Sequence, residues 1–322
     1  MSIDVSLWFA KLKSRSKLEP FKLSLANKID VKMFVKRDDL IDPFISGNKL
    51  RKLEGNLWAA KEAAATQLLT YGGAYSNHLL ASAAAANEMG IPIIGKVRGE
   101  ELNEKSNPML LECNRLSMDL QFIDRTTYNQ SKYQSGLSKE EEKPTWHIPE
   151  GGANPEGILG CTDIYKEAVV QNNNQHFDAV FLAQGTTTTS MGILASIPTT
   201  TQLFVVPVLK GFDSLSEMQA LASKAKQNPL TAHLQFNWSQ VTVLDTYHHG
   251  GYAKTTPELL HFTSAFNSTQ QFPIEPTYTA KALFALRDLL QKDDSRLINP
   301  TKSTLEPMWI LFVHTGGIQA ID

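Results

Sequence analysis

The sequence predicts an α/β fold built on open, twisted and mainly parallel sheet. Two observations predict this class. Apolar, β-branched runs alternate with segments of helical length over most of the 322 residues, and strands separated by such helices form parallel β-α-β units. Several runs end in glycines and small polar residues, where a loop enters a helix and ligands of such sheets bind. The length suits two domains, or one large α/β domain with an insertion.

The predicted strands are short apolar runs rich in β-branched residues. In chain order they are VKMFVKRD (31–38), QLLTYG (67–72), PIIGKVRG (92–99), LQFID (120–124), DAVFLAQG (178–185), LFVVPVL (203–209), VTVLD (241–245) and WILFVHTGG (309–317). Helices are predicted between them, at 48–65, 76–89, 107–116, 155–171, 187–196, 214–226, 256–266 and 279–292. The polar, charge-rich stretch 126–145 is expected to form a surface helix or loop before the chain returns to a core at 146–152.

Capping residues and side-chain size support several of these helices. Asn48 has the side chain of an N-cap, and leucines recur at helical spacing after it. Asn154 is the expected N-cap of the helix 155–171, which has a proline in its first turn. The alanine-rich helix 76–89 has small side chains that let it lie close against a sheet.

The composition of the chain limits the kinds of partner and the cellular compartment that we expect for it. A net charge of −2 and a pI near 6.5 argue against nucleic acid or an anionic membrane as the main partner. No apolar run approaches the roughly 20 residues that span a bilayer, and the first residues lack the pattern of a signal peptide. Cys113 and Cys161 form no disulfide framework, so a reducing cytoplasm is the expected compartment.

Lys49 stands at an unusual place in the helix predicted after Asn48. It falls in the first turn, where a cation faces the unfavourable, positive end of the helix dipole. Taken alone, the stretch SGNKLRKLE (46–54) favours an ordinary surface lysine. The alternative is a lysine placed there for chemistry.

The loop YGGAYSNH (71–78) ends a predicted strand and starts a predicted helix. Its two glycines are followed by Ser76, Asn77 and His78 at the helix N-terminus, where unpaired backbone N–H groups can receive an anion. Capping would explain a serine or an asparagine there, but not the glycine pair and the histidine together. Function and capping are left as equal alternatives.

The loop QGTTTTS (184–190) has the same design. Gly185 ends a strand, and the four threonines that follow are poor helix formers, which makes sense if their hydroxyl and N–H groups surround a phosphate. A flexible polar loop is the competing explanation. IPEGG (148–152) repeats the glycine pair, but plain turn chemistry explains it.

Taken together and in this order, these motifs resemble the pyridoxal-phosphate enzymes of the tryptophan-synthase-β fold type. Within that type the sequence is similar to the aminocyclopropanecarboxylate deaminase and D-cysteine desulfhydrase family. The resemblance covers nearly the whole chain, through KRDDL, SGNKLRKLE, GGAYSNH, NPMLLE, IPEGGANPEGILG, QGTTTTSMGI, GGYAK, PIEPTYTAKAL and HTGG. It implies two α/β domains with the cofactor in the cleft between them. The large domain would comprise 1–50 plus 150–322, and the smaller inserted domain 51–149.

The resemblance also implies roles for individual residues. Lys49 matches the lysine that forms the Schiff base with pyridoxal 5'-phosphate, and cations around it would lower its pKa. Asn77 matches the residue that hydrogen-bonds the cofactor's 3-hydroxyl, and the cofactor's phosphate would be surrounded by Gly185, Thr186, Thr187, Thr188 and Thr189. The residues matched to substrate binding are Ser76, Asn77 and His78. Tyr252 and Tyr278 match tyrosines that flank the substrate. Ser76 and both tyrosines are thereby expected to be catalytic with Lys49, and no metal is expected.

Two positions discriminate between reactions within the family. The deaminases have Glu and Leu where this chain has Thr279 and Thr315, as the desulfhydrases do. A carboxylate beside the pyridine nitrogen favours a strong electron sink for opening a cyclopropane, whereas a neutral hydroxyl suffices for losing a thiolate. The resemblance therefore favours conversion of D-cysteine to pyruvate, sulfide and ammonia. Aminocyclopropanecarboxylate deamination and binding of cofactor or amino acid without turnover remain alternatives. A homodimer acting on a small amino acid is expected.

Overall fold

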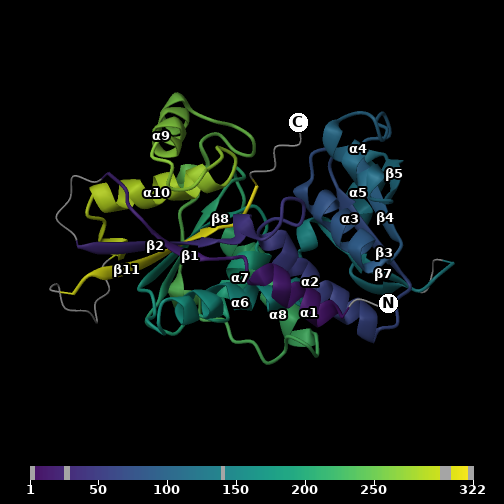
Figure 1. Cartoon of the computed structure of the whole chain (residues 1–322), viewed down its shortest axis with the longest axis horizontal. Helices are drawn as coiled ribbons and strands as arrows, with labels where there is room; N and C mark the ends of the chain where they lie inside the picture. Colours follow the sequence, from purple (N-terminus) through teal and green to yellow (C-terminus); the bar gives the residue numbers. More distant parts are fainter. Residues whose placement is uncertain (1–3, 25–29, 139–141, 298–305, 318–322) are drawn as a thin grey trace.

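Two β-sheets organise the computed structural model, which describes residues 4–24, 30–138, 142–297 and 306–317. A six-stranded sheet has the order β1-β2-β11-β8-β9-β10, and a five-stranded sheet has the order β5-β4-β3-β7-β6. The strands are β1 Leu18–Phe21, β2 Val31–Arg37, β3 Gln67–Gly72, β4 Ile93–Arg98, β5 Asp119–Ile123, β6 Gly136–Ser138, β7 Thr145–Ile148, β8 Ala179–Gln184, β9 Gln202–Pro207, β10 Val241–Val243 and β11 Met308–His314. The sheets lie towards opposite ends of the molecule's long axis (Figure 1).

Helices cover both faces of the larger sheet. They are α6 Pro155–Gln171, α7 Thr188–Leu194 and α8 Ser214–Gln227 on one face, and α9 Pro257–Asn267 and α10 Thr279–Gln291 on the other (Figure 1). Successive residues of a strand point to opposite faces of the sheet and so enter two different hydrophobic cores. Phe181 and Phe312 pack with α9 and α10, whereas Val180 and Leu311 pack with α6 to α8. The sheet is parallel except at β1, which pairs antiparallel with β2.

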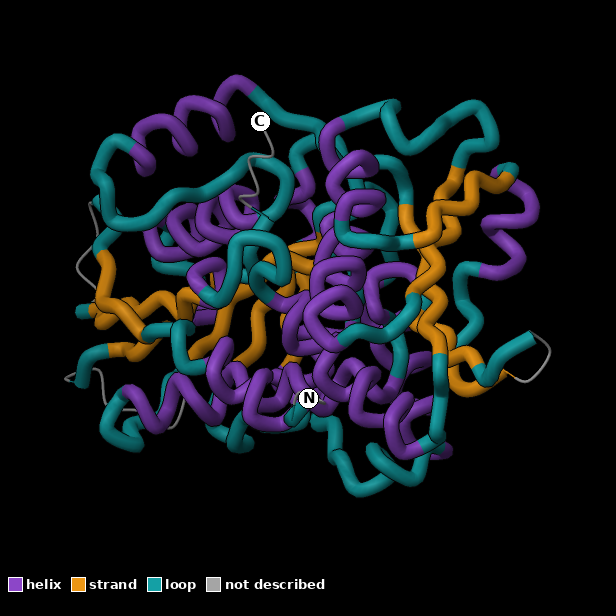
Figure 2. The backbone as a smooth tube through the Cα atoms, turned by 45° about the vertical axis from the view of Figure 1, so that its right-hand side comes forward, coloured by secondary structure: helices purple, strands orange, loops and turns teal. Residues whose placement is uncertain are grey.

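The smaller sheet is parallel except at β6, which pairs antiparallel with β7. Its core takes in α3 Asn77–Met89, α4 Pro108–Arg115 and two helices from outside the strands, α1 Val5–Lys13 and α2 Asn48–Glu62. Figure 2 shows these strands between the helices at the middle of the molecule and a short outer helix, α5 Arg125–Ser131. The apolar faces of the alanine-rich α3 therefore lie in a packed interior, as its composition predicts.

Helix α2 runs between the two sheets, and it crosses α6 at very short range. A Cβ atom added at Gly55 would come within 2.0 Å of Glu156 O, and one added at Gly160 within 2.0 Å of Arg51 O. Only glycine permits this approach. Because Leu50, Leu53 and Leu57 on α2 pack in the core of the smaller sheet, the helix joins both halves of the molecule.

The predicted α/β class is confirmed, and each predicted strand and helix is present with ends that move by a few residues. The sequence pattern missed β1, β6 and β7, and also α1. The N-cap of α2 is Gly47 rather than Asn48, so that expectation was wrong. Asn154 does cap α6, accepting a hydrogen bond from Gly157 N.

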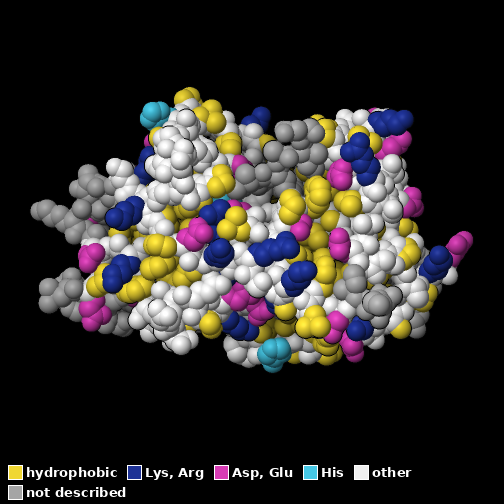
Figure 3. Space-filling view, in the orientation of Figure 1, with side chains coloured by type: hydrophobic (Ala, Val, Ile, Leu, Met, Phe, Trp, Pro, Cys, Tyr) yellow, Lys and Arg dark blue, Asp and Glu magenta, His cyan; other side chains and the backbone are white. Residues whose placement is uncertain are grey.

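The predicted domain boundaries stay a prediction. The strands of the smaller sheet all lie between 67 and 148, within the expected insertion 51–149. Phe9 and Leu12 of α1 nevertheless pack in the same core as that sheet. Across the described residues no helix is long and apolar enough to cross a membrane. Figure 3 shows charges of both signs mixed over one face of the molecule.

Candidate active site

Lys49 lies at the start of α2, and the end of β11 fixes that start. Gly47 has φ +64°, and a Cβ there would come within 1.9 Å of Thr315 O, so glycine is required on both counts. Asn48 N donates to Thr315 O at 3.1 Å. Backbone contacts thus hold the end of β11 against the start of α2. These contacts set the position of Lys49 and bring Thr315 beside it.

The Lys49 amine is suited to react as a nucleophile. Burial and the charge of Lys52 lower its pKa to about 7, and the nearby Cys161 acts in the opposite direction by raising it. Its Nζ donates to Asn48 Oδ1 at 2.8 Å. A lysine with this pKa is about half unprotonated at neutral pH, and the unprotonated amine is the form that attacks a carbonyl carbon.

Lys52 is a second cation at the site, and the sequence patterns indicated no ligand-binding role for it. It is 2% exposed, and its Nζ donates to Thr186 Oγ1 at 2.8 Å and Gly151 O at 3.0 Å. Burial lowers its pKa to about 8. Among the described residues no carboxylate pairs with it. A buried cation whose partners are neutral oxygens is suited to an anionic ligand. Its spacing three residues after Lys49, on the same helix face, was the available signal.

The threonine run forms a wall beside these lysines. Besides Thr186 on Lys52, Thr189 Oγ1 accepts a hydrogen bond from Asn48 Nδ2 at 2.9 Å, and Thr188 Oγ1 donates to Gly152 O at 3.3 Å. Helix α7 begins inside the run, and Thr187 precedes it without making a side-chain cap. The loop therefore faces α2 and the Gly151–Gly152 turn. The Thr186 hydroxyl accepts from Lys52 and keeps a proton that it can donate to an anion.

His78 joins this cluster as a neutral imidazole. Thr70 Oγ1 donates to Ile148 O at 2.9 Å, so its single proton is used and it accepts from His78 Nε2–H at 2.8 Å. His78 Nδ1 is then unprotonated, and it is buried without a partner. Burial, Lys49 and Lys52 together hold the pKa of His78 well below its ordinary value. In this state Nδ1 can accept a hydrogen bond but cannot donate one to a carboxylate.

Ser76 and Asn77 adjoin the cluster through His78. Ser76 is the N-cap of α3, where its Oγ accepts from Leu79 N at 3.3 Å. That bond uses a lone pair, so the hydroxyl proton is still available to a ligand. Asn77 is the first residue of α3 and is partly exposed. Both capping and ligand binding are therefore open to this segment.

Tyr278 and Tyr252 meet on the other side of the site. Their ring centroids are 5.9 Å apart, with the ring planes at 69°. Tyr278 lies beside Gly185, since a Cβ there would come within 3.0 Å of its ring. Burial and Tyr252 raise the pKa of Tyr278 well above its ordinary value. Tyr278 is thus a hydrogen-bonding group that keeps its proton.

Thr279 is buried beside Glu275, a residue that no sequence motif singled out. The Glu275 carboxylate accepts hydrogen bonds from Thr277 N at 2.6 Å, Tyr278 N at 2.9 Å and Thr279 N at 2.8 Å. It thereby provides acceptors for backbone N–H groups that have no partner within helix α10. Thr279 Oγ1 accepts from Glu275 N at 3.0 Å. The hydroxyl lies within this cap and also donates to Glu275 Oε1 at 3.2 Å, so backbone and hydroxyl donors together bind the neighbouring negative charge.

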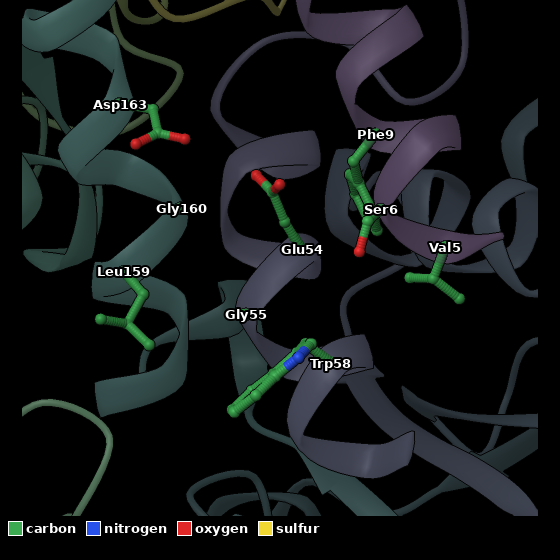
Figure 4. A pocket seen from close by; sticks show the side chains of 9 residues that line it. All are labelled: Val5, Ser6, Phe9, Glu54, Gly55, Trp58, Leu159, Gly160 and Asp163. Atoms are coloured by element: carbon green, nitrogen blue, oxygen red, sulfur yellow. The ribbon is translucent and has the colours of Figure 1, made fainter. Parts of the chain in front are cut away.

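A separate cavity of about 230 Å³ lies on the far side of α2. Figure 4 shows it among α1, α2 and α6, with Glu54 and Asp163 towards one end and Trp58 at the other. Lys13 Nζ bridges those carboxylates at 2.7 and 2.9 Å. Glu54 and Trp58 point away from Lys49 by helical periodicity. In the described part of the chain, no group of three or more metal-ligating side chains could hold an ion.

The described groups fit a phosphorylated aldehyde. The Lys49 amine can bond to the aldehyde carbon, and Lys52 with the threonine hydroxyls can hold the phosphate. Fold and site together are those expected of an enzyme that binds a phosphorylated carbonyl compound through a lysine.

A family model described as "Pyridoxal-phosphate dependent enzyme" matches residues 20–298. The chain belongs to this family of pyridoxal-phosphate-dependent enzymes, and pyridoxal phosphate is its cofactor. The resemblance seen in the sequence is therefore confirmed.

The chain is similar to curated proteins over almost its full length. It is 29% identical over 304 residues to a Thermotoga maritima protein provisionally named 1-aminocyclopropane-1-carboxylate deaminase, covering 92% of both chains. It is 28% identical over 318 residues to a D-cysteine desulfhydrase of Yersinia pestis, covering 93% of this chain and 91% of that one. A crystal structure of an ACC deaminase homologue shares the fold, with a TM-score of 0.72, 24% identity and coverage of 99% and 96%.

Proposed function

We propose that this enzyme catalyses β-elimination from a small D-amino acid with a good leaving group, and that D-cysteine is its substrate. With one water, D-cysteine would give pyruvate, sulfide and ammonia. The observation that carries this choice is the hydroxyl of Thr279, which places no free negative charge at the position where the resembling deaminases have a carboxylate. Glu275 does not replace it, because three backbone N–H groups already bind its carboxylate.

The residues that would hold the cofactor follow from the site. Lys49 would bind its aldehyde carbon, Lys52 and Thr186 to Thr189 its phosphate, Asn77 its 3-hydroxyl, and Thr279 with Thr315 its ring nitrogen. When bound, pyridoxal phosphate supplies an electron sink for negative charge at the α-carbon of an amino acid.

Lys49 Nζ is the group that would remove the α-proton. Its pKa of about 7 suits a general base working near neutral pH. Tyr278 is a poor base for this step, since its raised pKa keeps it protonated. Its hydroxyl would instead donate a hydrogen bond to the departing sulfur.

The substrate carboxylate would be held at the start of α3. Ser76 has a hydroxyl proton free to donate, and Asn77 adds an amide and a backbone N–H at the positive end of the helix. The neutral His78 would not donate from Nδ1. Its part would be to accept a hydrogen bond at this end of the site.

Two further expectations concern assembly and location, and the first of them rests on the family resemblance. We propose a homodimer, which light scattering on the purified holoenzyme would test. We also propose a cytoplasmic location, which agrees with the two buried, unpaired cysteines.

A parallel assay tests the reaction. Purified holoenzyme would be offered D-cysteine, L-cysteine and aminocyclopropanecarboxylate, with Lys49→Ala as the inactive control. Sulfide and pyruvate in equal amounts from D-cysteine are expected. Ketobutyrate from the cyclopropane substrate without sulfide from D-cysteine would establish the second candidate, the activity for which the Thermotoga relative is named. Cofactor binding with no turnover of any amino acid would reject catalysis altogether.

A further inference from the structure

Lys281 is a buried lysine in a helix that otherwise faces an apolar core. It is 0% exposed, and its neighbours Ala280, Ala282 and Leu283 on α10 belong to the largest core of the larger sheet. A buried ammonium costs several kcal/mol unless it is well paired. An apolar side chain of the same length would fill this site without that cost, so the packing of the core does not account for a lysine here.

The only acceptor that the structure gives Lys281 within the described residues is a loop carbonyl. Its Nζ donates to Gly251 O at 2.7 Å. Gly251 immediately precedes Tyr252, the tyrosine that meets Tyr278 at the site. Lys281 itself lies three residues after Tyr278, so the start of α10 carries one tyrosine and bonds to the residue before the other.

The loop that carries Tyr252 has a backbone that needs support. His249 (φ +49°) and Ala253 (φ +53°) are non-glycine residues in the left-handed region, and Gly250 and Gly251 have φ of +96° and +114°. Such conformations persist when surrounding contacts fix them. Tyr252 is 50% exposed, so its own side chain contributes little packing to hold the loop.

Few other bonds restrain this loop. Gly251 O also accepts from Lys254 N at 3.1 Å, and His249 Nδ1 pairs with Thr256 Oγ1 at 3.0 Å. Both bonds lie within the local segment. The His249 ring also packs edge-to-face with Phe284 of α10, with ring centroids 4.9 Å apart. Lys281 provides the hydrogen bond from α10 to Gly251 at the loop's tip, and a hydrogen bond from a charged donor is stronger than a neutral one.

We propose that Lys281 is a positioning residue that holds the loop 249–254 through Gly251 O, so that Tyr252 stays against Tyr278. This role rests on the proposed function, in which the two tyrosines flank the substrate. The predicted consequence is local. Without Lys281 the loop opens, Tyr252 leaves Tyr278, and the enzyme behaves as though Tyr252 had lost its hydroxyl.

The test compares Lys281→Met, which keeps the length and removes the donor, with Lys292→Met, a control at the exposed end of the same helix. Lys292 pairs only with Asp288 in the described structure, and its side chain is 66% exposed. Hydrogen exchange of holoenzyme should show opening of the peptide 248–256 increased about tenfold or more in Lys281→Met. The rest of α10 should be unchanged, and the control should match wild type.

A mutant cycle with Tyr252→Phe gives the second readout. With D-cysteine as probe, Lys281→Met should lower kcat/KM about as much as Tyr252→Phe, and the double variant should lower it no further. Exchange that is unchanged at 248–256, or raised equally through α10 and β8, would overturn the proposal. Additive losses in the cycle would do the same. If no amino acid is turned over, the proposed function fails while the exchange measurement still decides the role of Lys281 in holding the loop.

Discussion

At the scale of single residues, Lys49 differs from an ordinary lysine in the pH at which it reacts. Burial and Lys52 lower its pKa to about 7, so the neutral amine predominates above that pH. Pyridoxal, which lacks the phosphate that Lys52 would hold, should attach to apoenzyme with a midpoint near pH 7. In Lys52→Met this midpoint should rise, because a neighbouring positive charge is gone.

Visible absorbance of the attached pyridoxal would follow this titration, with borohydride reduction and peptide mapping to locate it. Lys292→Met should leave the midpoint in place. A midpoint near that of free lysine, or a label on another lysine, would contradict the prediction.

His78 gives a second prediction at this scale. Since Thr70 occupies Nε2–H and two lysines oppose protonation, the ring should stay neutral at about pH 6, where exposed histidines are largely charged. Nitrogen-15 NMR of histidine-labelled protein, assigned with His78→Gln, should show one protonated and one bare ring nitrogen through that range. A titration of the His78 signals near pH 6.5 would contradict the lowered pKa, and a proton on Nδ1 instead of Nε2 would contradict the tautomer.

At the scale of elements, the crossing of α2 and α6 sets how closely Lys49 can approach the rest of the site. Gly160→Ala would place a methyl group 2.0 Å from Arg51 O, so the helices must separate. We expect a loss of about 1–3 kcal/mol in unfolding free energy, measured by denaturant titration. Val170→Ala, on an exposed position of α6, is the matched control and should change little. Equal effects would mean that the crossing tolerates a methyl group.

Elements were predictable from sequence where a single pattern specified them. Buried parallel strands such as β8 and β9 are continuous apolar runs, and α6 has both an asparagine cap and a first-turn proline. The strand β1, Leu-Glu-Pro-Phe, lies at a sheet edge and carries a proline, so its pattern is weak. Lys52 and Glu275 were missed for a different reason: each matters through partners that are distant in sequence or are backbone atoms, which no local pattern specifies.

At the scale of the whole molecule, a buried ion network ties α2 to β2 and α6. Arg51 Nη2 lies 2.9 Å from Asp38 Oδ1 with both side chains 0% exposed, and Arg51 Nη1 lies 2.5 Å from Glu167 Oε1. Lys36 completes the group at 2.9 Å from Glu167. Arg51→Met leaves Asp38 unpaired in the interior and should cost about 3–5 kcal/mol. Arg125→Met, which breaks an exposed ion pair with Glu101, should leave stability nearly unchanged.

This network also predicts the direction of the pH dependence. Burial alone would raise the pKa of Asp38, but Arg51, Lys36 and Ser16 outweigh it and hold the pKa below its ordinary 3.8. A group with a depressed folded pKa stabilises the fold above its unfolded pKa and loses that contribution as pH falls through the folded value. The difference in unfolding free energy between wild type and Arg51→Met should therefore shrink below about pH 3.8. A constant difference down to about pH 2, measured by urea titration, would contradict it.

The position of β11 has a consequence for how the protein is made. This strand lies between β2 and β8 in the larger sheet, yet the ribosome synthesises it after every other described strand. Until it emerges, β2 has no neighbour on its inner side, and the carbonyl of Thr315 that receives Asn48 N–H does not exist. A nascent chain arrested before Met308 would therefore present Lys49 on a helix whose start lacks this backbone anchor. We therefore expect the cofactor to be captured after translation of the last strand rather than by the growing polypeptide.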